Sequence, residues 1–207
     1  MACVVAEPAG GDVIVIALDT ASRTSALVLR TDGAGTIQAE RQLPGGELDR
    51  RLPGAIAGLI DGGVDAVVVL TGPGSYTGVR AGMAAALGLA SARGLPLHGL
   101  GNLVAIAAAV RSGDASSFVA VADAGRGGLY VASFQPGDGG PEQVSGVRRC
   151  HAAELGPGVR AYTTTPLESL EAERLEPRVA LAAAVPRALG SAPLGVAGLS
   201  AIHADPC

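Results

Sequence analysis

A glycine-rich loop between two apolar segments is the part of this sequence best suited to chemistry. Residues 65–71 are a run of β-branched and aliphatic side chains, residues 72–78 read GPGSYTG, and the next fifteen residues carry almost no charge. A strand, a glycine loop and a helix in this order present backbone N–H groups and a helix N-terminus to a ligand or a partner. The loop therefore either binds a phosphate group or is the relic of a loop that did.

Three standard glycine motifs are absent from the loop. A Walker A loop ends in Gly-Lys-Ser/Thr, and the chain contains no lysine. A dinucleotide-binding loop reads G-x-G-x-x-G, whereas Gly72, Gly74 and Gly78 have one residue too many in the second interval. A nucleophile elbow has glycine two residues before and two residues after its serine, and Ser75 lacks both. The loop belongs to none of these three classes.

The segment after the loop, residues 77–93, is predicted to be a helix of unusual composition. No charged residue lies between Arg80 and Arg93. A helix that is apolar on all sides is either buried or part of an interface. Small residues that would let another helix approach closely recur at four-residue spacing, at Gly78, Gly82, Ala86 and Ala90. The residues alone leave a core helix and an interface helix both open.

Several polar residues near the loop have both a structural and a functional interpretation. Asp19 ends an apolar run and could hold a nucleotide-bound cation through water, or simply accept a hydrogen bond from the next backbone amide. Ser75 and Thr77 are natural caps for the helix that begins there. Arg80 lies at the helix end that disfavours a cation, so it is either solvated or paired with an acid or a partner. Tyr76 is a loop-tip aromatic, the type of residue that anchors interfaces.

Composition excludes several classes of protein. Apolar residues make up 48% of the 207, aromatic residues only 2%, and the net charge is −4. No basic run is present, which argues against a chain that grips nucleic acid by itself. The three cysteines, Cys3, Cys150 and Cys207, have no ligand spacing and indicate a reducing compartment. Without a signal peptide or a long apolar run, we expect a cytoplasmic protein with no membrane span.

The apolar pattern predicts alternating strands and helices. In the first half, strands are expected at residues 13–19, 24–30, 36–41, 65–71 and 96–100, with helices at 47–61 and 77–93. In the second half, we expect a helix at 102–111, strands at 118–123, 129–134 and 144–150, helical character at 168–174 and 178–189, and a loop-like end at 192–207. The strand that ends in Asp123 echoes the strand that ends in Asp19. A βββαβα unit whose first strand ends in Asp and turns directly into the second is the layout of the actin-like ATPase superfamily.

Three segments resemble the bacterial TsaB (YeaZ) family, part of the TsaB/TsaD group once labelled glycoproteases. They are ALDTASRTSALVL at residues 17–29, GPGSYTGVRAGMAAALGLASARGLPLHGLGNL at 72–103 and, more weakly, DAGRGGLY at 123–130 against D-A-R-x-x-E-V-Y in the family. The resemblance implies an α/β, two-lobed actin-like (RNase H-like) fold with mixed sheets flanked by helices. It divides the chain into a leader at 1–11, an N-terminal lobe at 12–104 and a smaller C-terminal lobe at 105–207.

The resemblance also implies a function and partners. Family members act in making threonylcarbamoyladenosine at position 37 of tRNA, where the paralogue TsaD holds a metal and transfers the threonylcarbamoyl group. A TsaB-type chain docks to TsaD as a scaffold and activator, with TsaE as a third, ATPase component. For this chain the resemblance implies no cofactor of its own, since ATP or ADP would act at the level of the complex. It further implies tRNA contact through the complex and a homodimer when the chain is isolated.

Two groups of residues follow from the resemblance, and neither is catalytic. The partner interface is expected on the paired N-lobe helices, at Leu52, Ile56, Tyr76, Val79, Arg80, Met83, Ala86, Leu87 and Ala90. A vestigial phosphate or nucleotide cleft is expected at Asp19, Thr20, Gly72, Gly74, Ser75, Thr77, Asp123 and Arg126. The catalytic paralogue carries metal-binding histidines in an N-H-L-x-x-H segment, whereas residues 101–106 contain no histidine.

Two other functions remain open beside the scaffold. The Asp19 hairpin and the glycine loop would suit a nucleotide-binding enzyme of the actin-like class, either an ATPase or a small-molecule kinase. A metalloprotease is the historical label, but the sequence offers no ligands for its metal. The chain also departs from the family pattern, with Gly128 where the family has Glu and no P-x-Y-L-R signature at residues 192–207. These departures bear on the second lobe and the tail.

Overall fold

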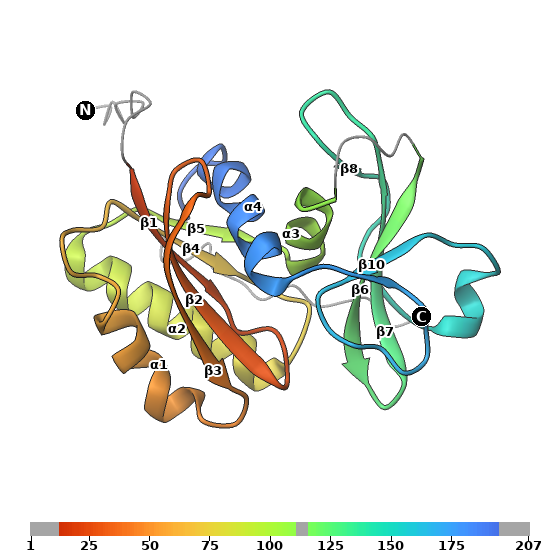
Figure 1. Cartoon of the computed structure of the whole chain (residues 1–207), viewed down its shortest axis with the longest axis horizontal. Helices are drawn as coiled ribbons and strands as arrows, with labels where there is room; N and C mark the ends of the chain where they lie inside the picture. The colour runs from red at the N-terminus through yellow and green to blue at the C-terminus, as the bar shows by residue number, and fades with distance from the viewer. Residues whose placement is uncertain (1–12, 111–115, 195–207) are drawn as a thin grey trace.

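In the computed structural model, which describes residues 13–110 and 116–194, the protein has two β-sheets with helices packed on them (Figure 1). The first sheet has the strand order β3-β2-β1-β4-β5, and the second has the order β11-β10-β6-β7-β8, with β9 also paired to β7. The leader expected at residues 1–11 and the end of the chain from residue 195 lie outside the described residues.

The first sheet begins with an antiparallel meander of three strands and continues with two parallel ones. Its strands are β1 (Ile14–Asp19), β2 (Ser25–Asp32), β3 (Ile37–Pro44), β4 (Ala66–Leu70) and β5 (Leu97–Leu100). The central strands β1 and β4 are continuous apolar runs because helices cover both faces of the sheet. The predicted order of strands and helices along the first half of the chain is confirmed, with boundaries shifted by a few residues.

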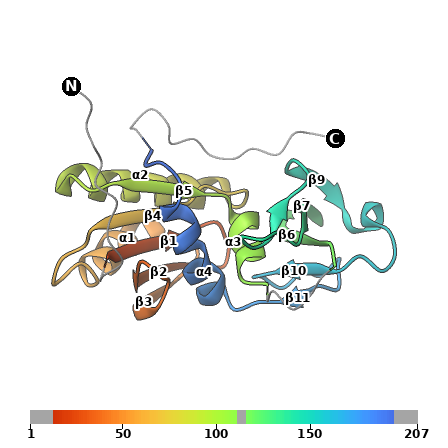
Figure 2. The same ribbon diagram turned by 90° about the horizontal axis from the view of Figure 1, so that it is seen from above.

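Three helices sandwich the first sheet (Figure 2). On one face lie α1 (Leu48–Ala57) and α2 (Tyr76–Arg93), and on the other lies α4 (Pro177–Leu189). The helix predicted at residues 47–61 ends early, at Ala57, where Gly58 takes the C-cap position. The last helix was assigned to the second lobe by the sequence division, but it packs against β1 and β2 of the first sheet.

The second sheet has its own core. It follows α3 (Asn102–Ala108) and contains β6 (Phe118–Gly125), β7 (Gly128–Gln135), β8 (Glu142–Gln143), β9 (Arg148–His151), β10 (Ala161–Thr163) and β11 (Glu173–Arg174). On the face that carries α3, the ring of Phe118 stacks on Phe134 with centroids 5.6 Å apart and meets the Tyr162 ring edge-on at 5.3 Å. This lobe therefore concentrates three of the chain's five aromatic residues in one cluster.

The elements of the second half were predicted less well than those of the first. The strand expected at residues 144–150 is only the four-residue β9, and β10 was not predicted at all. The helical character expected at 168–174 is wrong, because this stretch is a loop that ends in the two-residue β11. The apolar residues Leu167 and Leu170 imitate helical spacing, but they pack as single side chains against the second sheet.

Candidate functional site

Two carboxylates lie at the ends of corresponding strands, one in each lobe. Asp19 ends β1 and its Oδ1 accepts a hydrogen bond from the Ala21 amide at 2.9 Å. Asp123, near the end of β6, accepts one through Oδ1 from the Gly125 amide at 2.7 Å. In both cases an aspartate side chain holds the amide two residues further on, which fixes a tight turn into the next strand. The sequence echo between the two strands is therefore a structural echo as well.

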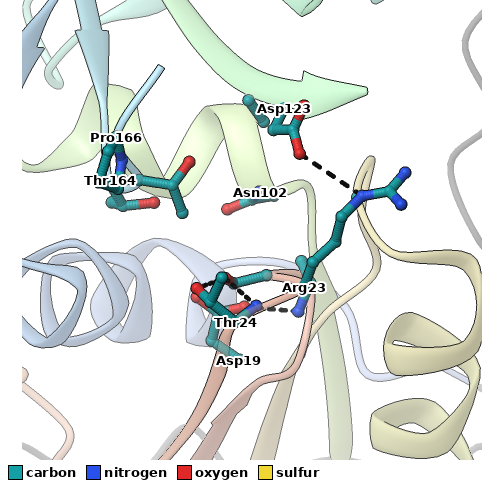
Figure 3. Close-up of a pocket in the computed structure, with 12 residues that line it drawn as sticks. Asp19, Arg23, Thr24, Asn102, Asp123, Thr164 and Pro166 are labelled. Atoms are coloured by element: carbon teal, nitrogen blue, oxygen red, sulfur yellow. Dashed lines mark hydrogen bonds and ion pairs between the residues drawn. The ribbon is translucent and has the colours of Figure 1, made fainter. Parts of the chain in front are cut away.

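We call the β1–β2 pair the first hairpin and the β6–β7 pair the second hairpin. A cavity of about 180 Å³ lies between these two hairpins (Figure 3). Asp19 and Gly74 line it from the first lobe, and Asp123 and Thr164 line it from the second, with Asn102 on the segment between them. A second hollow of about 270 Å³ continues from Asp19 toward the start of α4. The structure thus brings together three residues of the predicted cleft, Asp19, Gly74 and Asp123.

Burial makes Asp19 the unusual acid of this site. The residue is only 9% exposed. Loss of water around the carboxylate raises its pKa above the usual value, and the hydrogen bond from the Ala21 amide offsets part of this effect. The carboxylate that lines both hollows is therefore less readily ionised than an exposed aspartate.

An arginine joins the two hairpins across the cavity. Arg23, in the turn between β1 and β2, places its Nε 3.5 Å from Oδ2 of Asp123 (Figure 3). Its Nη2 also donates to the backbone oxygen of Ala124 at 3.5 Å. Both side chains of the ion pair are more than a third exposed, so water screens the pair. Arg23 was not among the predicted site residues, because nothing in a single sequence indicates which distant carboxylate an arginine meets.

The glycine loop is fastened by its own polar groups to the two neighbouring segments. The Ser75 amide donates to the Ala21 oxygen at 2.7 Å, and the Asn102 amide donates to the Gly72 oxygen at 2.6 Å. The Asn102 side chain adds a third bond, from Nδ2 to the Pro73 oxygen at 3.2 Å. Ser75 caps α2, because its Oγ accepts from the Gly78 amide at 3.3 Å. These amides and carbonyls hold the loop in place.

The glycines of the loop and of α2 allow close packing against the first hairpin. A Cβ at Gly74 would overlap the backbone oxygen of Ala21, and one at Gly78 would overlap the backbone oxygen of Thr20. One turn later, a Cβ at Gly82 would overlap Oγ1 of Thr20, which is fully buried. Side chains at these positions would push the helix away from the hairpin. The glycines therefore serve contact between segments of this chain.

The charges that line the cavity do not suit a polyphosphate. Two carboxylates line it, and its one arginine is already paired with Asp123. A polyphosphate would meet negative charge and a loop whose Ser75 amide is already bonded to Ala21. Thr20, Gly72 and Thr77 do not line the cavity either.

Most residues predicted for the partner interface are buried inside this chain. The side chains of Leu52 and Ile56 on α1 and those of Val79, Met83, Ala86 and Ala90 on α2 belong to the core between these helices and the first sheet. The stripe of small residues therefore faces the sheet and the first hairpin of this chain. Leu87 is half-buried at the edge of the same core.

The outward face of α2 has a different set of residues. Tyr76 is 61% exposed, and the guanidinium of Arg80 lies over its ring, 3.8 Å from the centroid. Arg80 thus pairs with an aromatic ring of its own helix. Further along the same face, Ala84, Gly88 and Ser91 are exposed. This outward face, from Tyr76 to Ser91, has no charge after Arg80.

The cleft also contains polar residues that sequence reasoning did not select. Arg23, Asn102, Thr164 and Thr165 all line the cavity. Asn102 could have been noticed as the first residue of a predicted helix, a position where side chains often bond to backbone. The two threonines follow β10, a strand that the sequence did not reveal. Arg126, which was predicted for the cleft, lines a neighbouring groove at the tip of the second hairpin, which shares Arg23, Asp123 and Pro166 with the cavity.

Within the described ranges, 13–110 and 116–194, no three His, Cys, Asp or Glu side chains are grouped so that they could hold a metal ion. No helix in those ranges is long and apolar enough to cross a membrane.

Solved structures show which fold this is. YeaZ from Pseudomonas aeruginosa superposes with a TM-score of 0.70 at 20% identity, covering 92% of this chain and 99% of that one. A second structure, an uncharacterized protein with similarity to peptidase YeaZ, also from Pseudomonas aeruginosa, gives 0.62 at 21% identity, with coverages of 88% and 99%. The expected two-lobed actin-like fold is confirmed.

Sequence comparison gives the family. The tRNA threonylcarbamoyladenosine biosynthesis protein TsaB of Escherichia coli (strain K12) is 35% identical over 133 residues, which are 61% of this chain and 57% of that protein. An uncharacterized protein of Mycobacterium leprae (strain TN) is 36% identical over 133 residues, 60% of this chain and 36% of that one. The chain thus spans less than two thirds of the length of these relatives. The predicted resemblance to the TsaB/YeaZ group is confirmed. A family model described as TsaD, tRNA N6-adenosine threonylcarbamoyltransferase, matches residues 56–161, just over half of the 207, and the chain belongs to that family.

Proposed function

We propose that this chain is a non-catalytic scaffold and activator in the biosynthesis of tRNA threonylcarbamoyladenosine, docking to the catalytic TsaD paralogue in the cytoplasm. Membership of the family and the likeness to TsaB supply the pathway. The cleft supports the non-catalytic role, because residues 101–106, which the resemblance sets against the histidine segment of the catalytic paralogue, contain no histidine. Within this stretch, the side chain and amide of Asn102 hold the glycine loop.

The outward face of α2 is the observation that carries this proposal. A surface helix normally presents charged residues to water, yet the exposed positions Ala84, Gly88 and Ser91 carry none. Tyr76 adds a large exposed aromatic at the start of the same face. Small residues in the middle with an aromatic anchor at one end suit close packing against a helix of a partner. The partner is the TsaD paralogue, and a second copy of this chain would use the same face when TsaD is absent.

The test is the assembly state, measured by light scattering after size exclusion. The chain alone is expected to be a homodimer and to form a 1:1 complex when mixed with TsaD from the same genome. Ala84→Arg puts a long cation in the middle of the outward face and should weaken the complex at least about tenfold. Ala153→Arg is the matched control, because Ala153 is exposed on the second lobe. If the wild-type chain forms no complex with TsaD, the proposal is wrong.

The binding of TsaE, tRNA and nucleotide, which the proposal also includes, is tested by separate binding measurements. TsaE is expected to bind the preformed complex, and tRNA is expected to bind the complex more tightly than the isolated chain. ATP or ADP should bind only when TsaD is present. Stoichiometric nucleotide turnover by this chain alone would favour the alternative, an actin-like enzyme.

A further inference from the structure

Arg80 is an exposed cation near the N-terminal end of α2, where the helix dipole disfavours positive charge. The first turn of α2 contains no acidic residue. The sequence from residue 66 to residue 113, which includes β4, α2, β5 and α3, contains none either. These four elements therefore offer Arg80 no carboxylate to neutralise its charge.

The ring of Tyr76 holds the guanidinium of Arg80 in place. The two residues are four positions apart on the helix, so their side chains are neighbours on its surface. Cζ of Arg80 lies 3.8 Å from the centroid of the ring. Stacking occupies the flat side of a guanidinium and leaves the N–H donors at its edge for other groups. In the described parts of the chain, no carboxylate pairs with these donors.

A helix that packs on the outward face of α2 would take water away from Arg80. Ala84, one turn further on, and Gly88 are exposed and small, so they let another helix come close. Burying a guanidinium is costly unless a carboxylate pairs with it. The face therefore suits a partner helix that has a carboxylate opposite Arg80 and small or apolar residues beyond it.

A second copy of this chain offers no such carboxylate on its own α2. Helix α2 carries only the cations Arg80 and Arg93. On α1, which packs beside α2, Glu47 is already paired with Arg51, and Asp49 is half-buried. A symmetric dimer presents the same surface from both copies. When two such faces meet, Arg80 would have to stay at the wet edge of the contact.

We propose that Arg80 determines the specificity of the outward face of α2 by pairing with a carboxylate on a helix of the TsaD paralogue. This inference rests on the proposed function, from which it takes the partner. Tyr76 is a positioning residue that holds the guanidinium ready for the carboxylate. A two-pronged pair between guanidinium and carboxylate fixes the register of the two helices. It favours the heterodimer over the homodimer, because the second copy lacks the matching acid.

The test applies the same substitutions to two assemblies. Calorimetric titration with TsaD from the same genome gives Kd of the heterodimer, and analytical ultracentrifugation of the chain alone gives Kd of the homodimer. Arg80→Met removes the charge and keeps a long, unbranched side chain that favours a helix. Arg80→Glu reverses the charge, and Arg80→Lys keeps it without the planar fork. Arg93→Met is the matched control, because Arg93 is also exposed on α2 but lies about 140° away around the helix axis.

The expected order of heterodimer affinity follows charge. Arg80→Met should weaken the heterodimer about tenfold, the effect of losing a hydrogen-bonded charge pair. Arg80→Glu should weaken it further, because two carboxylates would then face each other. Arg80→Lys should lose less than Arg80→Met. The homodimer should be as tight with Arg80→Met as with the wild type, and Arg93→Met should change neither Kd.

Three results would overturn the inference. They are an unchanged heterodimer with Arg80→Met, a heterodimer with Arg80→Glu no weaker than with Arg80→Met, and equal weakening of both assemblies. Equal weakening would mean that Arg80 acts through packing of the helix and has no part in choosing the partner. In each of these cases the wild type still binds TsaD, so the proposed function stands. If the wild-type chain forms no complex with TsaD, both are wrong.

Discussion

The two hairpins of this protein share one local design and use it differently. In each, an aspartate at or near the end of a strand holds the amide two residues on. The first hairpin is pressed against the glycine loop and α2, so that Asp19 and Thr20 are buried. The second hairpin projects into solvent, and Asp123 is half-exposed and paired with Arg23. The same short motif therefore builds core in one lobe and an accessible surface in the other.

The difference in burial between the two hairpins distinguishes structural from functional residues better than their shared aspartate turn does. At the first hairpin, the Ser75 amide is bonded to the Ala21 oxygen, and Gly74 and Gly78 lie against the backbone of Ala21 and Thr20. At the second, Arg126 and Gly127 have open space around them. We infer that the first hairpin fixes the geometry of the lobe, while the second is available to bind other molecules. Three predictions test this contrast.

The largest effect is expected at the close contact between α2 and the first hairpin. In Gly78→Ala the new methyl group would overlap the Thr20 backbone oxygen, which cannot rotate away. Overpacking of this kind typically costs 1–3 kcal/mol, and against rigid backbone we expect about 3 kcal/mol of unfolding free energy or more. Chemical denaturation followed by circular dichroism measures this.

Gly88→Ala is the matched control on the same helix. A Cβ at Gly88 has nothing within 4 Å, so the substitution should stabilise the chain by about 0.5–1 kcal/mol through helix propensity. If Gly78→Ala proves as harmless as Gly88→Ala, the first hairpin is not tightly packed and the contrast between the hairpins fails.

Sequence reasoning succeeded where a segment carries an uninterrupted apolar pattern. The strands β1 and β4 are uninterrupted apolar runs, the helix α2 is a long one that ends at a glycine, and all three were predicted. It failed at β10 and β11, which are three and two residues long. Such strands are held by parallel pairing with neighbours that are distant in sequence, and no local pattern encodes that pairing.

The site could be predicted only in part. Asp19 and Gly74 were found from the strand end and the glycine loop to which they belong, and Asp123 from the resemblance to the TsaB family. The apolar character of α2 was also recognised, but not which of its faces is buried: among the residues chosen, Val79, Met83, Ala86 and Ala90 face the core, and Tyr76 and Arg80 are exposed. Periodicity alone cannot settle this for a helix rich in alanine and glycine, because every face is then apolar. Arg23 and Thr164 needed the tertiary structure.

The second prediction concerns the buried carboxylate and pH. Burial raises the pKa of Asp19 in the folded chain above its ordinary value of 3.8. Its contribution to stability is therefore fully present below that value and is lost as pH rises through the folded pKa. Asp19→Asn keeps an oxygen acceptor for the Ala21 amide and does not ionise. The stability of Asp19→Asn relative to the wild type should thus increase from pH 3 upward and then level off.

The midpoint of denaturant unfolding is measured across a pH series for the wild type and the variant side by side. The other titrating groups are common to both proteins, so their effect cancels in the difference in stability. A difference that stays constant, or that moves in favour of the wild type as pH rises, would mean that Asp19 is solvated. The first hairpin would then be as open as the second.

The smallest effect is expected at the ion pair of the second hairpin. Arg23 and Asp123 are both more than a third exposed, and pairs of this kind contribute about 0.2–1 kcal/mol. A double-mutant cycle of Arg23→Ala, Asp123→Ala and the double variant isolates the coupling energy. Loss of the Gly125 amide bond accompanies every Asp123→Ala arm and cancels in the cycle. The coupling should also weaken between 50 and 500 mM salt, because screening acts on exposed charges.

A coupling energy of about 2 kcal/mol that does not change with salt would instead indicate a desolvated contact. The second hairpin would then be fixed against the first lobe as firmly as the first hairpin is.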